Sequence, residues 1–270
     1  RITHYITFPL KRKKKLSTYW KIVRELRKEN GELGVIFVNT FISALLFRLG
    51  NVKKNIGYNR EGRGFLLDFS PEINYHKHYI NRYAFLFNEY IGNKYVYLPE
   101  LSLRYTGQKT FQFDNSHKTI ALYLGGENKE FRKYPDEYAV QLLRLLNRQG
   151  YNLLLIGDEN DNIKHTQYAE EARIDHLINL TARTTIEGFI NTIANVDLII
   201  TIDSSALHIA AAVKTPFIAL MGLSTSPTST ILPKVPLGRI LKIENNLIRE
   251  EDYIRNITPD LILKTISELI

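Results

Sequence analysis

Short apolar runs alternate with segments of helical periodicity along most of the chain. In the first part, the apolar run at residues 35–38 predicts a buried strand, and the spacing of apolar residues predicts helices over 18–26 and 43–49. Aromatic side chains also recur at helical spacing over 75–90, where packing in a core is the simplest explanation. Such alternation is typical of α/β proteins with a mostly parallel sheet.

The pattern is clearest after residue 118. Strands are predicted at residues 119–124, 152–156, 197–202 and 216–221. Helices are predicted from Pro135 to a cap at Gly150, over 184–195 with a capping box formed by Thr184 and Glu187, over 205–213, and over 257–269. This second part is expected to be a Rossmann-like unit, with its loops gathered at the carboxyl ends of the strands.

The length of the chain favours two domains, because 270 residues exceed what one core comfortably fills. The polar and weakly patterned residues 101–117 are interpreted as the linker between them. We expect an N-terminal domain over 1–112, a second domain over 113–256 and a C-terminal helix over 257–270.

Composition narrows the class of protein. The chain has no cysteine, which excludes disulfides, thiolate metal sites and cysteine nucleophiles. Its longest nearly apolar stretch, 35–47, is shorter than the roughly 20 residues of a membrane span, and no charged-then-apolar leader is present. A cytoplasmic protein is the simplest expectation. Because residue 1 is Arg, the chain is interpreted as a fragment or a processed product.

The net charge of +8 is unevenly distributed. Residues 1–60 carry 14 basic and three acidic side chains, whereas the rest of the chain carries 22 basic and 25 acidic ones. The basic part includes an uninterrupted run at 11–15. Such a balance favours an anionic partner, namely nucleic acid, a phosphorylated glycolipid or the membrane surface. A solvated basic loop is the alternative explanation of the run.

The most informative segment follows the strand predicted at 197–202. Asp203 ends the strand, Ser204 and Ser205 begin a helix, and His208 follows within its first turns. A helix N-terminus offers N–H groups and the positive end of a dipole, and both suit phosphate. The alternative is that Asp203 or Ser204 simply caps the helix, and that His208 is structural.

A second segment lies after the strand predicted at 119–124. The pair Gly125-Gly126 allows close approach of a ligand to the backbone. Arg132 and Lys133 follow directly before the helix that begins at Pro135, where a cation can stabilise the charge of a departing nucleoside diphosphate. The two segments, each at a strand end, together favour a nucleotide site.

These segments resemble glycosyltransferase family nine, the bacterial heptosyltransferases. The resemblance rests on motifs at residues 124–126, 132–135, 157–161, 179–184 and 203–208. It extends into the first part through the stretches 38–46, 56–58 and 62–67. It implies a GT-B type α/β fold of two Rossmann-like domains facing a cleft, with the N-terminal domain incomplete in this chain.

The resemblance also implies an activity. An inverting, metal-independent transferase without a cofactor would move a heptose from ADP-heptose to an anionic acceptor, the inner core of lipopolysaccharide. The basic N-terminal part would hold that acceptor, and the enzyme is expected in the cytoplasm, with contact to the inner-membrane surface left open. Nucleic acid is not an expected partner, because no known reader motif is present.

The resemblance also implies roles for individual residues of this chain, according to their place in the motifs. Arg132 and Lys133 would act on the departing ADP, and the general base would lie N-terminal to Arg1. Either Glu159 or Asp161 would bind the ribose hydroxyls, and Asp203 would position the donor sugar or the phosphate loop. The remaining donor-binding residues would be Gly125, Gly126, Glu127, Ser204, Ser205 and His208.

Three positions depart from the family pattern. Ser205 and Ala182 stand where glycines are expected, and Arg132 stands in place of a lysine. Arginine and lysine differ in the geometry with which they hold phosphate. Alternatives are therefore a non-catalytic or degenerate paralogue that binds nucleotide sugars, and a family-nine transferase for another sugar.

Overall fold

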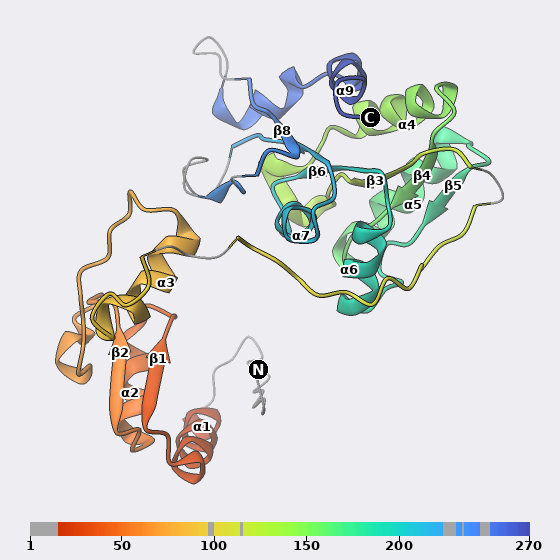
Figure 1. The fold of residues 1–270 in the computed structure, drawn as a ribbon. Coiled ribbons are helices and arrows are strands. Elements are labelled where there is room, and N and C mark those ends of the chain that lie inside the picture. The colour runs from red at the N-terminus through yellow and green to blue at the C-terminus, as the bar shows by residue number, and fades with distance from the viewer. Residues whose placement is uncertain (1–15, 97–99, 114–115, 224–230, 234, 244–248) are drawn as a thin grey trace. The chain divides into compact units, whose positions relative to one another are not determined.

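The computed structural model describes residues 16–96, 100–113, 116–223, 231–233, 235–243 and 249–270. The chain divides into two compact units, unit 1 over Arg1–Pro99 and unit 2 over Glu100–Ile270 (Figure 1). Within the described ranges, no helix is both long and apolar enough to cross a membrane. The basic run at 11–15 lies outside the described residues.

Unit 1 is built around two parallel strands. Its elements in chain order are α1 (Leu16–Glu29), β1 (Leu33–Ile36), α2 (Phe41–Leu49), β2 (Lys54–Gly57), the 3₁₀ helix η1 (Arg63–Leu66) and α3 (Tyr79–Tyr90). The strands pair from Leu33 opposite Lys54 to Ile36 opposite Gly57. The helices predicted over 18–26 and 43–49 are confirmed, and the strand lies two residues before the expected position.

A buried arginine organises the loop that follows β1. Arg63 is fully buried. Its guanidinium donates to the carbonyl oxygens of Tyr58 and Val38 and to the side chains of Ser43 and Asn39. A buried charge is costly unless its hydrogen bonds are satisfied, so this set of acceptors fixes residues 38–43 against η1.

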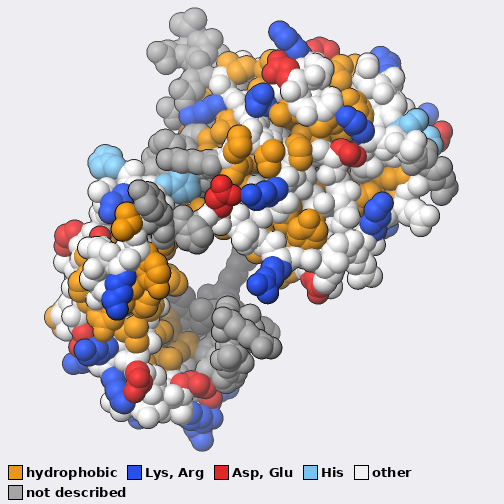
Figure 2. Space-filling model, in the orientation of Figure 1, with side chains coloured by type: hydrophobic (Ala, Val, Ile, Leu, Met, Phe, Trp, Pro, Cys, Tyr) orange, Lys and Arg blue, Asp and Glu red, His pale blue; other side chains and the backbone are white. Residues whose placement is uncertain are grey.

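Unit 1 leaves many large apolar side chains on its surface. Its cluster of buried hydrophobic residues is small, consisting of Ile36, Ala44, Leu66 and Leu67. Figure 2 shows hydrophobic side chains gathered on the visible face of this unit, with basic and acidic side chains around them. Exposed examples on unit 1 are Leu16, Trp20, Phe37, Val38, Phe65 and Ile80.

Unit 2 contains a six-stranded, all-parallel sheet with the strand order β5-β4-β3-β6-β7-β8. The strands are β3 (Thr119–Tyr123), β4 (Asn152–Leu155), β5 (Leu177–Asn179), β6 (Leu198–Ile202), β7 (Phe217–Leu220) and β8 (Gly238–Leu241). The α-helices are α4 (Asp136–Arg148), α5 (Asn162–Ala172), α6 (Ile186–Ala194), α7 (Ser205–Val213) and α9 (Pro259–Ile266). This is the doubly wound Rossmann order, and the order reverses between β3 and β6.

The four central strands are buried along their whole length. Continuous burial is expected where helices cover both faces of a parallel sheet, and it explains the unbroken apolar runs of the sequence. Helix α9 belongs to this core, since Ile262 and Ile266 join the same buried cluster as the strands. The hydroxyl of Tyr134 also donates to Ile257 O at 2.8 Å, which fastens the start of the C-terminal segment to the body of unit 2.

Most elements predicted in unit 2 are confirmed, including α7 with both of its bounds. The expected capping box at the start of α6 is wrong by one residue, because Thr185 rather than Thr184 caps the helix by accepting from the Gly188 amide. Among the strands and α-helices in the described residues, the sequence pattern missed β2, α5, β5 and β8. Among these, β5 and β8 are short strands at the two edges of the sheet, where half-exposed residues blur the apolar signal.

Residues expected to form a linker are instead held on unit 2. Asn191 of α6 accepts from the amides of Thr106 and Gly107 through Oδ1, and its Nδ2 donates to Thr106 Oγ1 at 2.9 Å. Leu103 N donates to Ala212 O at the end of α7. The division between the units therefore falls between Pro99 and Glu100 rather than between residues 112 and 113. Hydrogen bonds from Asn191 and Ala212 therefore hold residues 103–107, and Phe111 and Phe113 further along the segment pack against the core of unit 2.

Asn191→Ala is expected to release residues 103–107. It removes the shared acceptor of two amides and leaves buried polar groups unpaired, at a cost of about 1–3 kcal/mol in the free energy of unfolding. Hydrogen exchange should accelerate at Thr106 and Gly107. Asn195→Ala, one turn further along, removes a side chain whose Nδ2 donates to Asn191 O; it is the matched control and should leave that exchange unchanged. Unaltered protection in Asn191→Ala would contradict this anchoring role.

Candidate functional site

The two sequence segments singled out for chemistry meet where the strand order of unit 2 reverses. Strands β3 and β6 are neighbours, with Tyr123 opposite Thr201. The glycine pair follows β3, and Asp203 with Ser204 follows β6, so the two loops leave the same edge of the sheet side by side. In open α/β sheets, the crevice at such a switch point is the usual place for a ligand.

Both glycines of the β3 loop are required by packing within the protein. Gly125 has a φ of +82°, and a Cβ there would lie 2.6 Å from Ile202 Cδ1. A Cβ at Gly126 would lie 2.5 Å from Asn160 O. The glycine pair was expected to allow a ligand close to the backbone, but at Gly126 the close approach is made by the loop after β4.

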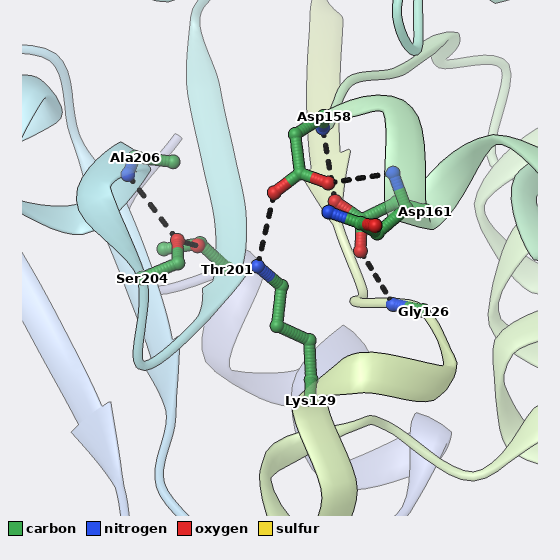
Figure 3. Close-up of polar contacts among 8 residues, drawn as sticks. Gly126, Lys129, Asp158, Asp161, Thr201, Ser204 and Ala206 are labelled. Atoms are coloured by element: carbon green, nitrogen blue, oxygen red, sulfur yellow. Dashed lines mark hydrogen bonds and ion pairs between the residues drawn. The ribbon is translucent and has the colours of Figure 1, made fainter. Parts of the chain in front are cut away.

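Asp161 joins the loops after β3 and β4. It ends the 3₁₀ helix η3 (Glu159–Asp161) and is fully buried. Its carboxylate accepts from Gly126 N at 2.6 Å and from Asp158 N at 2.9 Å (Figure 3). Burial, followed by the charge of this carboxylate, raises the pKa of Tyr123 far above its ordinary value. Asp161 is thus a buried structural brace rather than an exposed ligand for ribose.

Lys129 is a cation at the site that the motif analysis missed. It lies on the 3₁₀ helix η2 (Glu127–Arg132), and its Nζ is 3.2 Å from Asp158 Oδ2 and 5.6 Å from the centroid of the Tyr123 ring. Burial alone would raise the pKa of Asp158, but hydrogen bonds from the Asn160 amide and Lys129 outweigh it and lower that pKa. The signal in the sequence that could have indicated Lys129 is a basic residue between the glycine pair and Pro135.

The turn from β6 into α7 carries the remaining candidates. Ser204 caps α7, its Oγ accepting from Ala206 N at 3.2 Å and lying 3.0 Å from Thr201 Oγ1 (Figure 3). Asp203 is buried directly before the cap. Ser205 is exposed as the first helical residue, and His208 is half-buried one turn further on. The capping role that the sequence left open for Ser204 is confirmed. The same hydroxyl also lies at the carboxyl edge of the sheet, beside Thr201.

Lys133 is paired with a carboxylate at the start of α4. Its Nζ lies 2.8 Å from Asp136 Oδ1 in α4, a carboxylate that Lys164 and Tyr168 also bind. Burial alone would raise the pKa of Asp136, but these three partners lower it to about 2. With Asp252 and Arg255, Lys133 lines a separate pocket of about 240 Å³ that includes no residue of the β6–α7 turn.

The other candidates are placed as follows. Arg132 is half-buried at the end of η2, close enough for its charge to act on the Tyr123 hydroxyl. Glu159 is exposed at the start of η3. The side chain of Glu127 lies outside the described residues.

Ala182 and His165 shape the backbone of the loop after β5. Ala182 has a φ of 60°, a left-handed conformation that explains why a glycine is expected there. Its amide donates to Gly157 O at 3.1 Å. The buried His165 bonds through Nδ1 to Thr181 Oγ1 at 2.8 Å, and burial lowers its pKa to about 4. His165 is therefore neutral at neutral pH.

Comparison with known proteins agrees with this geometry. The structure of Escherichia coli ADP-heptose lps heptosyltransferase II matches with a TM-score of 0.78 at 22% identity, over 94% of this chain and 81% of that one. The glycosyl transferase family 9 structure from Veillonella parvula matches with a TM-score of 0.79 at 15% identity, over 94% and 78% of the two chains. The fold is GT-B, as expected.

The family is shown by the sequence itself. The family model described as Glycosyltransferase family 9 (heptosyltransferase) matches residues 19–251, so the chain belongs to that family. A relative in Haemophilus influenzae, lipooligosaccharide heptosyltransferase 2, is 26% identical over 94% of this chain and 81% of its own length. The resemblance seen in the motifs is thereby confirmed.

Ala182→Gly is expected to stabilise the protein. The left-handed conformation costs an L-residue about 1–2 kcal/mol, partly offset by the roughly 0.5–1 kcal/mol of extra backbone entropy that glycine loses on folding. Thermal unfolding should therefore show a melting temperature higher by a few degrees. Ala169→Gly, in the regular helix α5, is the matched control and should lose about 1 kcal/mol. Equal losses in both variants would show that Ala182 is unstrained.

Proposed function

We propose that this protein transfers a heptose from ADP-heptose to the inner core of lipopolysaccharide. The observation that carries the proposal is the meeting of the glycine loop and the β6–α7 turn at the switch point of the sheet. Membership of family 9 and the names of its relatives support the heptose donor and the lipopolysaccharide acceptor.

In this proposal, the start of α7 binds the donor diphosphate. Its first-turn amides and dipole favour an anion, and the hydroxyls of Ser204 and Ser205 add hydrogen-bond donors. Buried Asp203 and half-buried His208 flank that turn and would orient the donor sugar. The exposed carboxylate of Glu159 would accept hydrogen bonds from the ribose, the role for which buried Asp161 is unsuited.

Arg132 would stabilise the leaving group. In a single displacement, the acceptor oxygen forms a bond to the anomeric carbon as the bond to the diphosphate breaks, so the configuration inverts and ADP departs with the bonding electrons. The acceptor proton passes to a base. A cation held near the β-phosphate offsets the charge that develops there, without requiring a metal ion. The Gly125–Gly126 loop leads into η2, at whose end Arg132 lies.

The acceptor would be held by unit 1. Residues 1–60 carry a large excess of basic side chains, which complements the phosphates and acidic sugars of an inner core. The reaction would take place in the cytoplasm, at the surface of the inner membrane. A family-nine transferase for another sugar differs from this proposal only in the donor and acceptor that it selects.

ADP should raise the melting temperature of the protein, because a ligand that binds only the native state stabilises it. UDP and GDP serve as controls for recognition of the nucleobase, and each should raise the melting temperature less than ADP does at equal concentration. Unchanged melting with all three nucleotides would contradict the donor site.

Arg132→Ala should lower the rate of heptose transfer to a heptose-deficient lipopolysaccharide by about 10²–10³, with a much smaller change in the Kd for the intact donor ADP-heptose. The reason is that the charge offset by Arg132 develops in the transition state. Lys133→Ala, which removes the neighbouring cation bonded to Asp136, is the matched control and should retain most of the rate. Parental rates in both variants would refute the role of Arg132, and EDTA should leave the parental rate unchanged.

A further inference from the structure

We propose that Lys129 is a second cation of the donor site, held by Asp158 in the free protein and transferred to the diphosphate when the donor binds. The inference rests on the proposed nucleotide-diphosphate site and adds a binding residue to it. The family motif that led to Arg132 does not include this position, three residues earlier on η2.

Lys129 lies where three loops meet. Its ammonium contacts Asp158 in the loop after β4 and lies over the ring of Tyr123 at the end of β3. Tyr123 is opposite Thr201 in β6, whose hydroxyl is 3.0 Å from that of Ser204. Figure 3 shows the Lys129 side chain rising from η2 between the Ser204 turn and the Asp161 loop. An anion bound at the start of α7 would therefore lie within the field of this ammonium.

Carboxylates gather at this edge of the sheet. The described acidic side chains that follow β4 and β6 are Asp158, Glu159, Asp161 and Asp203. A diphosphate adds further negative charge, and Lys133 is already engaged with Asp136. A second cation beside Arg132 reduces the repulsion between these carboxylates and the ligand. Lys129, on the same 3₁₀ helix, is placed to act as that cation.

The ion pair between Lys129 and Asp158 is not needed to hold the loops. Asp161 already joins them with two hydrogen bonds from a fully buried carboxylate. The Asp158 side chain is 48% exposed, and an ion pair of that exposure contributes little to stability. Asp158 would also keep its bond to the Asn160 amide after losing Lys129. The Lys129 ammonium can thus exchange the Asp158 carboxylate for a phosphate at a small cost in free energy. Until the donor binds, the ion pair keeps the ammonium in position.

Calorimetric titration of ADP and AMP into single variants tests this role. Lys129→Met should raise the Kd for ADP by about tenfold or more, as expected for a lost charge-assisted hydrogen bond, with a clearly smaller change for AMP. Lys129→Arg should bind ADP nearly as the parent does. Asp158→Asn should bind ADP more tightly, because it removes a competing carboxylate. Lys164→Met removes a lysine of similar exposure, 18% against 20%, paired with Asp136, and should leave ADP binding unchanged.

The signs of these effects separate the possible roles. Unchanged ADP affinity in Lys129→Met would overturn the proposal, and so would equal weakening in Lys129→Met and Asp158→Asn, since the pair would then only brace the loops. Lys129→Gln provides a second neutral variant if the methionine variant folds poorly. A parent that binds none of ADP, UDP and GDP would refute the donor site itself, whereas a parent that binds ADP with unaffected variants would refute only the role of Lys129.

Discussion

The buried carboxylate of Asp161 is the interaction on which the candidate site depends. It bonds to the amides of Gly126 and Asp158, which belong to loops following adjacent strands. A buried charge is stable only when its acceptor sites are filled, so these bonds define a single arrangement of the two loops. The absence of a Cβ at Gly126 allows the loops to approach that closely.

Fixing these loops determines what lies at the sheet edge. The β3 loop leads into η2, which carries Lys129 and Arg132, and the loop after β4 presents Asp158 to Lys129 and exposes Glu159. Charges of both signs are thus concentrated around a helix N-terminus. The arrangement suits a ligand with an anionic diphosphate and a neutral ribose, because each part meets groups of the appropriate charge.

The sequence predicted those parts of the fold whose signal is local. Helix α7 was predicted with its bounds because a serine cap, a run of small apolar residues and a following Lys-Thr-Pro stop act over neighbouring positions. Residues 103–110 and the edge strand β5 carry no such local signal, because hydrogen bonds to distant residues hold them in place. The structural role of Asp161 was not predicted for the same reason, because its partner Gly126 is 35 residues away. The motifs identified the loops that lie together, but they did not distinguish residues that brace these loops from residues that could bind a ligand.

A crystal structure with ADP bound tests the central claim most directly. The account predicts density for the diphosphate at the start of α7, with the ammonium of Lys129 moved from Asp158 onto a phosphate oxygen and the ribose near Glu159. Diphosphate density in the separate pocket lined by Lys133 and Arg255, with the pair between Lys129 and Asp158 intact, would contradict it.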